Sequence, residues 1–325
     1  MSTFIIRRLL QAILVMALMS VIVFFGVNVI GDPVHMLVSP EADQAEIEAA
    51  IRRLGLDKPI WEQYLLFVKN AMQGDLGKSF IFGEPALKLI FHHMPATLEL
   101  AFSALFLAVL IGIPLGLFAG LNPDSPISKG IMAGSIFGFS LPTFWVGLML
   151  ILVFSVELGW LPSTGRGETR SVLGFETSLA TVDGLKHIIL PALNLALLKI
   201  SLAVRLTRAG VREAMGQDYV KFARAKGLST NRIIFVHVLK NIMIPVVTVM
   251  GLELGSLIGF SVVTEKIFAW PGMGKLLIDA ILQLDRPVVV AYLMIIVVFF
   301  VLINMIVDIL YSILDPRVRL QDQGA

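Results

Sequence analysis

The chain has 325 residues, of which 57% are hydrophobic and only 15% are charged, and its formal net charge is +2. A typical soluble domain has about half apolar and about a quarter charged residues, so this composition excludes an ordinary soluble globule. The absence of cysteine excludes disulfide scaffolds, thiolate metal sites and cysteine nucleophiles. The hydrophobic residues form runs of about 20, the length that crosses a bilayer as an α-helix. We therefore expect an all-α polytopic membrane protein.

Hydrophobic runs predict six transmembrane helices. The first run follows the short segment 1–8 and is too long for a typical signal peptide, so we expect it to be retained. Some runs contain proline or glycine, and Gly112 and Gly116 are expected to permit close helix packing. The predicted spans are residues 9–30, 96–120, 131–157, 187–207, 241–262 and 288–313.

The distribution of lysine and arginine predicts the orientation. Residues 205–240 contain eight lysines or arginines and two acids, which gives +6 against +2 for the whole chain. Positive residues favour the cytoplasmic side of a membrane, so we expect the loop 208–240 in the cytoplasm. Alternation across the six spans then places residues 1–8 and the tail 314–325 in the cytoplasm as well, and residues 31–95 outside.

The external segment 31–95 has the pattern of ordered helices rather than of a linker. Residues 40–55 predict one helix, with Ile47 and Ile51 on the same stripe. A second helix is expected to begin after residues 57–59, with apolar side chains along one face at Trp61, Leu65 and Val68.

A short helix is predicted inside the basic loop, over residues 219–226 of the segment 218–227. Asp218 is a good N-cap candidate, and Gly227 suits the left-handed position that ends a helix. Helical spacing puts four side chains on one face, namely Tyr219, Phe222, Ala223 and Lys226. Such a stripe fits a groove on a partner protein. It fits equally well an amphipathic helix that rests on anionic lipid headgroups.

Residues 219–228 also resemble the cytoplasmic "EAA" loop of bacterial ATP-binding-cassette (ABC) importer permeases, and more narrowly of the dipeptide, oligopeptide and nickel branch, first subunit of its pair. The loop departs from the broader pattern because Lys221-Phe222-Ala223 stand before Gly227 where that pattern has Glu-Ala-Ala. The likeness covers nearly the whole chain. Its other motifs begin at Phe4, Gly31, Leu54, Gly74, Pro95, Gly112, Leu141, His187, Phe268 and Asp315.

The resemblance implies a type I ABC importer fold in the bacterial inner membrane, and a transport subunit rather than an enzyme. A homologous second permease would form the other half of the pathway, and an external substrate-binding protein would deliver the cargo. Two partner subunits would bind and hydrolyse Mg-ATP, so this chain would need no cofactor or metal. Its coupling helix would contact an ATPase through Asp218, Tyr219, Phe222, Ala223, Arg224, Ala225, Lys226 and Gly227.

The cargo is left open by the resemblance, because this branch carries dipeptides, oligopeptides, glutathione and nickel chelates. Two charged residues, Lys199 and Glu253, fall inside predicted spans. At 1.5 Å per residue both lie near mid-membrane, about 6 Å apart in depth, so we predict that they pair. A structural ion pair, a pair that contacts cargo and the absence of contact all remain open. Trp270, at a predicted helix break, and Asn304, in the last span, are further candidates for the pathway.

An ion- or proton-coupled secondary carrier, with Lys199 and Glu253 as its relay, is the alternative function. The sequence shows no internal duplication of the kind found in inverted-repeat carriers. A membrane receptor or scaffold is a third possibility, which the glycine and proline residues within the spans make less attractive. Co-purification separates these classes, because a permease requires ATPase partners and a carrier works alone.

Overall fold

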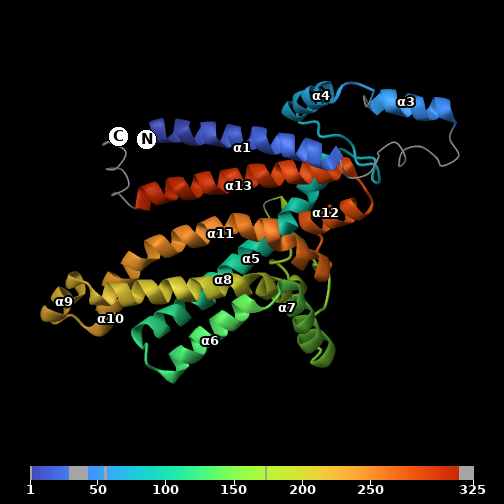
Figure 1. Cartoon of the computed structure of the whole chain (residues 1–325). Coiled ribbons are helices and arrows are strands. Elements are labelled where there is room, and N and C mark those ends of the chain that lie inside the picture. The colour runs from blue at the N-terminus through green and yellow to red at the C-terminus, as the bar shows by residue number, and fades with distance from the viewer. Residues whose placement is uncertain (1, 29–42, 55–56, 173, 315–325) are drawn as a thin grey trace. The chain divides into compact units, whose positions relative to one another are not determined.

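The computed structural model of the chain describes residues 2–28, 43–54, 57–172 and 174–314, and these residues form helices together with a short β-hairpin (Figure 1). The expected all-α class is therefore confirmed. The chain divides into two units. The first unit comprises Met1–Thr97 and Pro271–Val301, and the second comprises Leu98–Trp270 and Leu302–Ala325.

Helices of the first unit come from both ends of the chain. The long helix α5 begins in this unit and continues in the second, as does the last helix, α13. The helices are α1 (Ser2–Asn28), α3 (Gln44–Leu54), α4 (Ile60–Met72), the start of α5 (Ala86–Leu121), α12 (Met273–Leu282) and the start of α13 (Arg286–Leu314). Helices α3 and α4 confirm the two helices predicted in segment 31–95, although the predicted start of the first, at residue 40, lies outside the described residues.

A buried carboxylate holds the first unit together across a long stretch of sequence. Asp285, at the junction of α12 and α13, accepts hydrogen bonds from the Ser79 hydroxyl and, at 3.1 Å, from the Phe80 amide. The amide of Met273, at the start of α12, donates to the Thr97 hydroxyl over 2.8 Å. The loop before α5 is therefore hydrogen-bonded to the residue before α13, and α5 itself is hydrogen-bonded to the start of α12.

The second unit contains the longest helices. Its two strands pair antiparallel, with Arg170 opposite Thr177 and Val172 opposite Phe175. In chain order its elements after α5 are α6 (Pro126–Ser140), α7 (Thr143–Leu150), the π-helix η1 (Ile151–Glu157), β1 (Arg170–Val172), β2 (Phe175–Thr177), α8 (Val182–Gly216), α9 (Asp218–Ala225), α10 (Thr230–Arg232), the π-helix η2 (Ile233–Val238) and α11 (Leu239–Ile267).

Helices α5 and α8 approach each other along a seam of glycines. A β-carbon on Gly112 would lie 2.5 Å from the Ala203 β-carbon, and one on Gly116 would lie 2.6 Å from the Val204 carbonyl oxygen. Gly120 is equally crowded, because its β-carbon would lie 2.6 Å from that of Val211. Small residues of this kind allow membrane helices to pack backbone against backbone, which confirms the expected role of Gly112 and Gly116.

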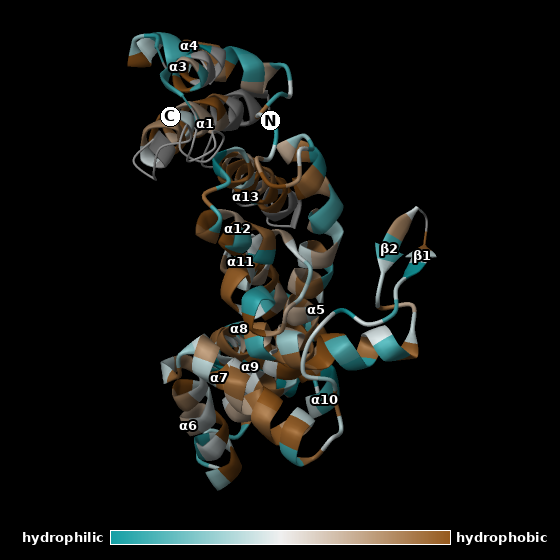
Figure 2. Ribbon diagram, turned by 90° about the vertical axis from the view of Figure 1, so that its right-hand side faces the viewer, coloured by the Kyte–Doolittle hydropathy of each residue, from teal (hydrophilic) through white to brown (hydrophobic). Residues whose placement is uncertain are grey.

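Four helices of the described residues are long and apolar enough to cross a membrane, and hydrophobic residues dominate their ribbons (Figure 2). The predicted span 131–157 differs from expectation, because it consists of α6 and α7–η1 bent by 107°. Pro142 explains the bend, since a proline disfavours helical geometry in the residue before it. The described part of α1 has a shorter apolar stretch, Leu10–Gly26, so the total of six spans stays a prediction. The four helices are Ala86–Leu121, Val182–Gly216, Thr230–Ile267 and Arg286–Val307.

Candidate functional site

Helix α9 occupies the predicted position but begins one residue earlier than expected. Gln217, with an extended backbone (φ −74°, ψ 153°), is the N-cap, so the expectation that Asp218 caps the helix is wrong. Asp218 lies in the first turn, where an acidic side chain is favourable, and pairs with Lys221 at 2.9 Å. Gly227 has φ +72° directly after the C-cap Lys226, which confirms its predicted left-handed conformation.

The two faces of α9 have different surroundings. Val220 and Ala223 are 0% and 5% exposed. Tyr219 and Phe222 are 38% and 61% exposed, and the Lys226 ammonium lies 4.5 Å from the centroid of the Phe222 ring. The exposed face therefore contains the aromatic residues and Lys226. Ala223 does not lie on this face, which corrects the predicted stripe.

A hydrophobic cluster fixes α9 to the rest of the second unit. The buried side chains of α9 pack with residues of α8 and of the continuous helix Thr230–Ile267, which includes α10, η2 and α11. Helix α9 is therefore an attached element rather than a loose loop. The buried members of the cluster are Val211, Ala214, Val220, Ala223, Ile233, Val238 and Ile242.

Lys199 on α8 and Glu253 on α11 form an ion pair, as predicted. The Lys199 ammonium also donates to the Ser256 hydroxyl over 2.8 Å, and that hydroxyl donates to Glu253 over 2.7 Å. The Lys199 and Glu253 side chains are 15% and 25% exposed. Sequence reasoning missed Ser256, although its position three residues after Glu253 places both on one side of a helix. We call these three residues the polar triad.

Trp270 and Asn304, the other two candidates for the pathway, lie on the elements where they were predicted. Trp270 lies in the break between α11 and α12, as expected, but its side chain is fully buried, so it does not line an open passage in this structure. The Arg166 guanidinium lies 5.9 Å from the centroid of its ring. Asn304 is partly buried on α13, and its role in the pathway stays a prediction.

A buried network around Glu99 was not predicted. The Glu99 carboxylate pairs with Arg166 and accepts hydrogen bonds from the hydroxyl and, at 3.0 Å, the amide of Ser178. Arg166 also donates to the Glu176 carbonyl over 2.8 Å, which fixes the hairpin β1–β2. The partners are 67 and 79 residues from Glu99 in the sequence, beyond the reach of periodicity. The sequence feature that could have pointed to this network was the Glu99 carboxylate, which lies inside the predicted span 96–120.

Comparison with known proteins identifies the family. Residues 112–320 match the family described as binding-protein-dependent transport system inner membrane component, and residues 1–101 match the N-terminal family of such membrane components. The chain belongs to this family. It is therefore a permease subunit of an ABC importer, a multi-pass protein of the inner membrane, and its family is not the ATP-hydrolysing component. The secondary carrier consequently loses its support.

The relatives match over nearly the full length of the chain. The chain is 40% identical to the di/tripeptide transport system permease protein DppB of Pseudomonas aeruginosa, covering 99% of this chain and 100% of the relative. It is 41% identical to the oligopeptide transport system permease protein AppB of Bacillus subtilis, with 98% and 100% covered. It is 38% identical to the glutathione transport system permease protein GsiC of Escherichia coli, with 98% and 99% covered.

A solved structure supports the fold. The MetNI methionine ABC transporter, in an inward-facing conformation, contains a chain that aligns with a TM-score of 0.50 and 17% identity, covering 70% of this chain and 96% of that chain. At this identity the likeness concerns the fold alone. The expected type I ABC importer fold is thereby supported.

Proposed function

We propose that this chain is the first permease subunit of a peptide importer. The three relatives are named for di- and tripeptides, oligopeptides and glutathione, which share peptide bonds and charged termini. A homologous second permease would complete the pathway, two ATPase subunits would supply the energy, and an external binding protein would deliver the peptide. Mg-ATP would be held by the ATPase subunits, and this chain would need no cofactor.

In the proposed topology both termini are cytoplasmic. Residues 31–95 are external, residues 208–240 form the cytoplasmic coupling loop, and residues 96–313 contain the transmembrane core. The charge of the coupling loop supports this orientation, because positively charged loops favour the cytoplasm. A reporter fused after residue 325 that is active only in the cytoplasm is expected to be active.

The two-sided construction of α9 carries the coupling proposal. Its aliphatic side packs onto α8 and the helix Thr230–Ile267, while Tyr219 and Phe222 remain exposed on the other side. An exposed aromatic pair on an anchored helix is the arrangement that an ATPase groove would bind. Movement of that groove would then displace the two long helices together with α9.

The test compares two phenylalanines of similar exposure. Phe222 on α9 is 61% exposed and Phe235 on η2 is 60% exposed. We expect Phe222→Ala to lower ATP-driven peptide uptake by about tenfold, because loss of an interface anchor costs about 1–2 kcal/mol or more. Phe235→Ala is expected to leave uptake nearly unchanged. Equal effects of the two substitutions, with equal membrane levels, would remove the coupling role of α9.

A second assay addresses the cargo. Uptake of labelled dipeptide, tripeptide and glutathione into vesicles that contain the complete transporter is expected to require ATP and to differ among the three. Uptake of none of these compounds, with ATP-dependent uptake of another solute class, would overturn the peptide assignment and leave the importer assignment intact.

A further inference from the structure

We propose that α4 lies within the lipid leaflet that surrounds the carboxyl half of α1, with Trp61, Leu65 and Met72 in contact with lipid. The proposal concerns how this external segment is held at the membrane. It rests on the family's membrane location and is independent of the cargo and of the coupling role of α9.

Contacts between α4 and α1 set the depth of α4. The Tyr64 hydroxyl lies 2.9 Å from the Ser20 hydroxyl. Ser20 falls near the middle of the apolar stretch Leu10–Gly26, only about 3 Å beyond its central residue at 1.5 Å per residue. Helix α4 therefore packs beside the apolar part of α1 rather than beyond its end, and both ribbon views show the two helices side by side (Figures 1 and 2).

Aromatic rings strengthen this packing. The Phe24 ring lies 5.4 Å from the Tyr64 ring and 5.6 Å from the Phe67 ring, measured between centroids. Phe25 stacks on Tyr64 at 6.4 Å. Tyr64 and Phe67 thus define the side of α4 that faces α1. Their contacts with Phe24 extend toward the carboxyl end of the apolar stretch of α1.

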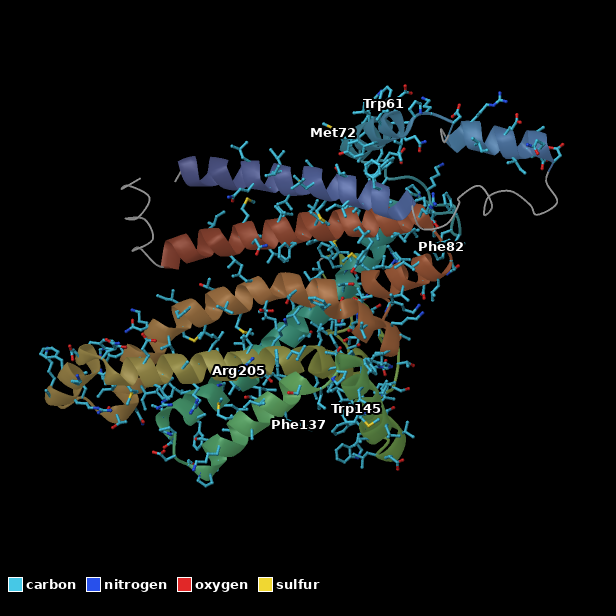
Figure 3. The ribbon with its side chains drawn as sticks, viewed as in Figure 1. Trp61, Met72, Phe82, Phe137, Trp145 and Arg205 are labelled. Atoms are coloured by element: carbon cyan, nitrogen blue, oxygen red, sulfur yellow. The ribbon has the colours of Figure 1, made fainter. Side chains whose placement is uncertain are left out.

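The apolar arc of α4 is wider than the side that α1 covers. At about 100° per residue, Trp61, Leu65 and Met72 fall within about 40° of one another, next to the α1-facing side. Their exposed fractions are 59%, 59% and 85%. Figure 3 shows Trp61 and Met72 toward opposite ends of α4. The polar residues fall on a separate arc, which also contains the exposed Leu66, and are Glu62, Gln63, Lys69 and Asn70.

Lipid fits this exposed arc better than water does. The exposed surface of α1 is also apolar, with Leu18 at 56% and Ile22 at 60%. Tryptophan is favoured at the level of the headgroups. An amphipathic helix with separate apolar and polar arcs lies in the interface with its apolar arc toward the acyl chains. Lys69, beside the apolar arc, can extend its ammonium group to the headgroups.

The natural absence of cysteine makes a direct test possible. Single cysteines would be placed at Trp61, Leu65, Met72 and Glu62 in the intact transporter, spin-labelled, and studied in nanodiscs of phosphatidylethanolamine and phosphatidylglycerol. Labels at Leu18, on the exposed face of α1, and at Asp124, in an exposed loop, provide the lipid and water references. Accessibility to oxygen reports lipid, and accessibility to a water-soluble nickel chelate reports water.

We expect labels at Trp61, Leu65 and Met72 to resemble Leu18, with oxygen accessibility several-fold above nickel accessibility, and Glu62 to show the reverse preference. Nickel accessibility at Leu65 and Met72 equal to that at Asp124 would place α4 in water and overturn the proposal. Protection from both reagents would show that protein covers the arc, which would also overturn it. Transport by the same variants tests the importer assignment separately.

Discussion

Helix α9 packs on α8 and α11, and the polar triad lies between the same two helices, but the two regions differ in whether their side chains are satisfied within the chain. The triad satisfies its charges within the chain, since Lys199, Glu253 and Ser256 bond to one another. Helix α9 leaves two aromatic rings exposed while its aliphatic residues are buried. These contacts support a role of the triad in holding the two long helices together, and they support the proposal that α9 presents its exposed rings to another protein.

The largest effect is expected from breaking the triad. Lys199→Ala would leave the partly buried Glu253 carboxylate without its cation and is expected to lower stability by about 3–5 kcal/mol. The exchange of both residues, Lys199→Glu with Glu253→Lys, is expected to recover part of that loss. Thermal unfolding of the purified transporter measures both. An exchange variant no more stable than either single variant would count against direct pairing.

A smaller effect is expected from enlarging the buried side of α9. Ala223→Leu would overfill the cluster around Val220 and is expected to lower stability by about 1–3 kcal/mol. Ala225→Leu is the matched control, because Ala225 is exposed on the same helix. Its stability is expected to change by less than about 0.5 kcal/mol. Equal melting temperatures for the two variants would refute the two-sided description of α9.

The smallest effect is expected from Ser256→Ala. This change removes the bridging hydroxyl but keeps the ion pair, so the expected loss is about 1 kcal/mol. Transport is expected to continue at nearly the normal rate, which a filter-based uptake assay measures. Loss of uptake without loss of stability would instead assign the triad to the transport pathway and weaken the contrast with α9.

Local patterns predicted much of this molecule. The left-handed conformation of Gly227 followed from the helix-capping residues around it, and the contact of Lys199 with Glu253 followed from their similar depth in the membrane. Both features depend on a few neighbouring residues and a fixed rise per residue, which is information that a sequence contains.

Features that depend on burial by distant segments could not be predicted. Periodicity places Tyr219 and Ala223 on one broad stripe, but only tertiary packing decides which part of that stripe the chain covers itself. The burial of Trp270 could not be predicted for the same reason, because a helix break does not reveal what packs over the break. The pairing of Glu99 with Arg166 joins segments far apart in sequence, and the hydrophobic pattern of the chain cannot predict such a pair.

The glycine seam of α5 also matters for biogenesis. During synthesis α5 leaves the ribosome before α8, so the surface around Gly112, Gly116 and Gly120 has no helix to meet until α8 is made. We expect lipid tails to cover that backbone in the interval and to be expelled when α8 docks. Assembly of the second unit is therefore a replacement of lipid by protein along the seam, and any larger residue there would block the replacement.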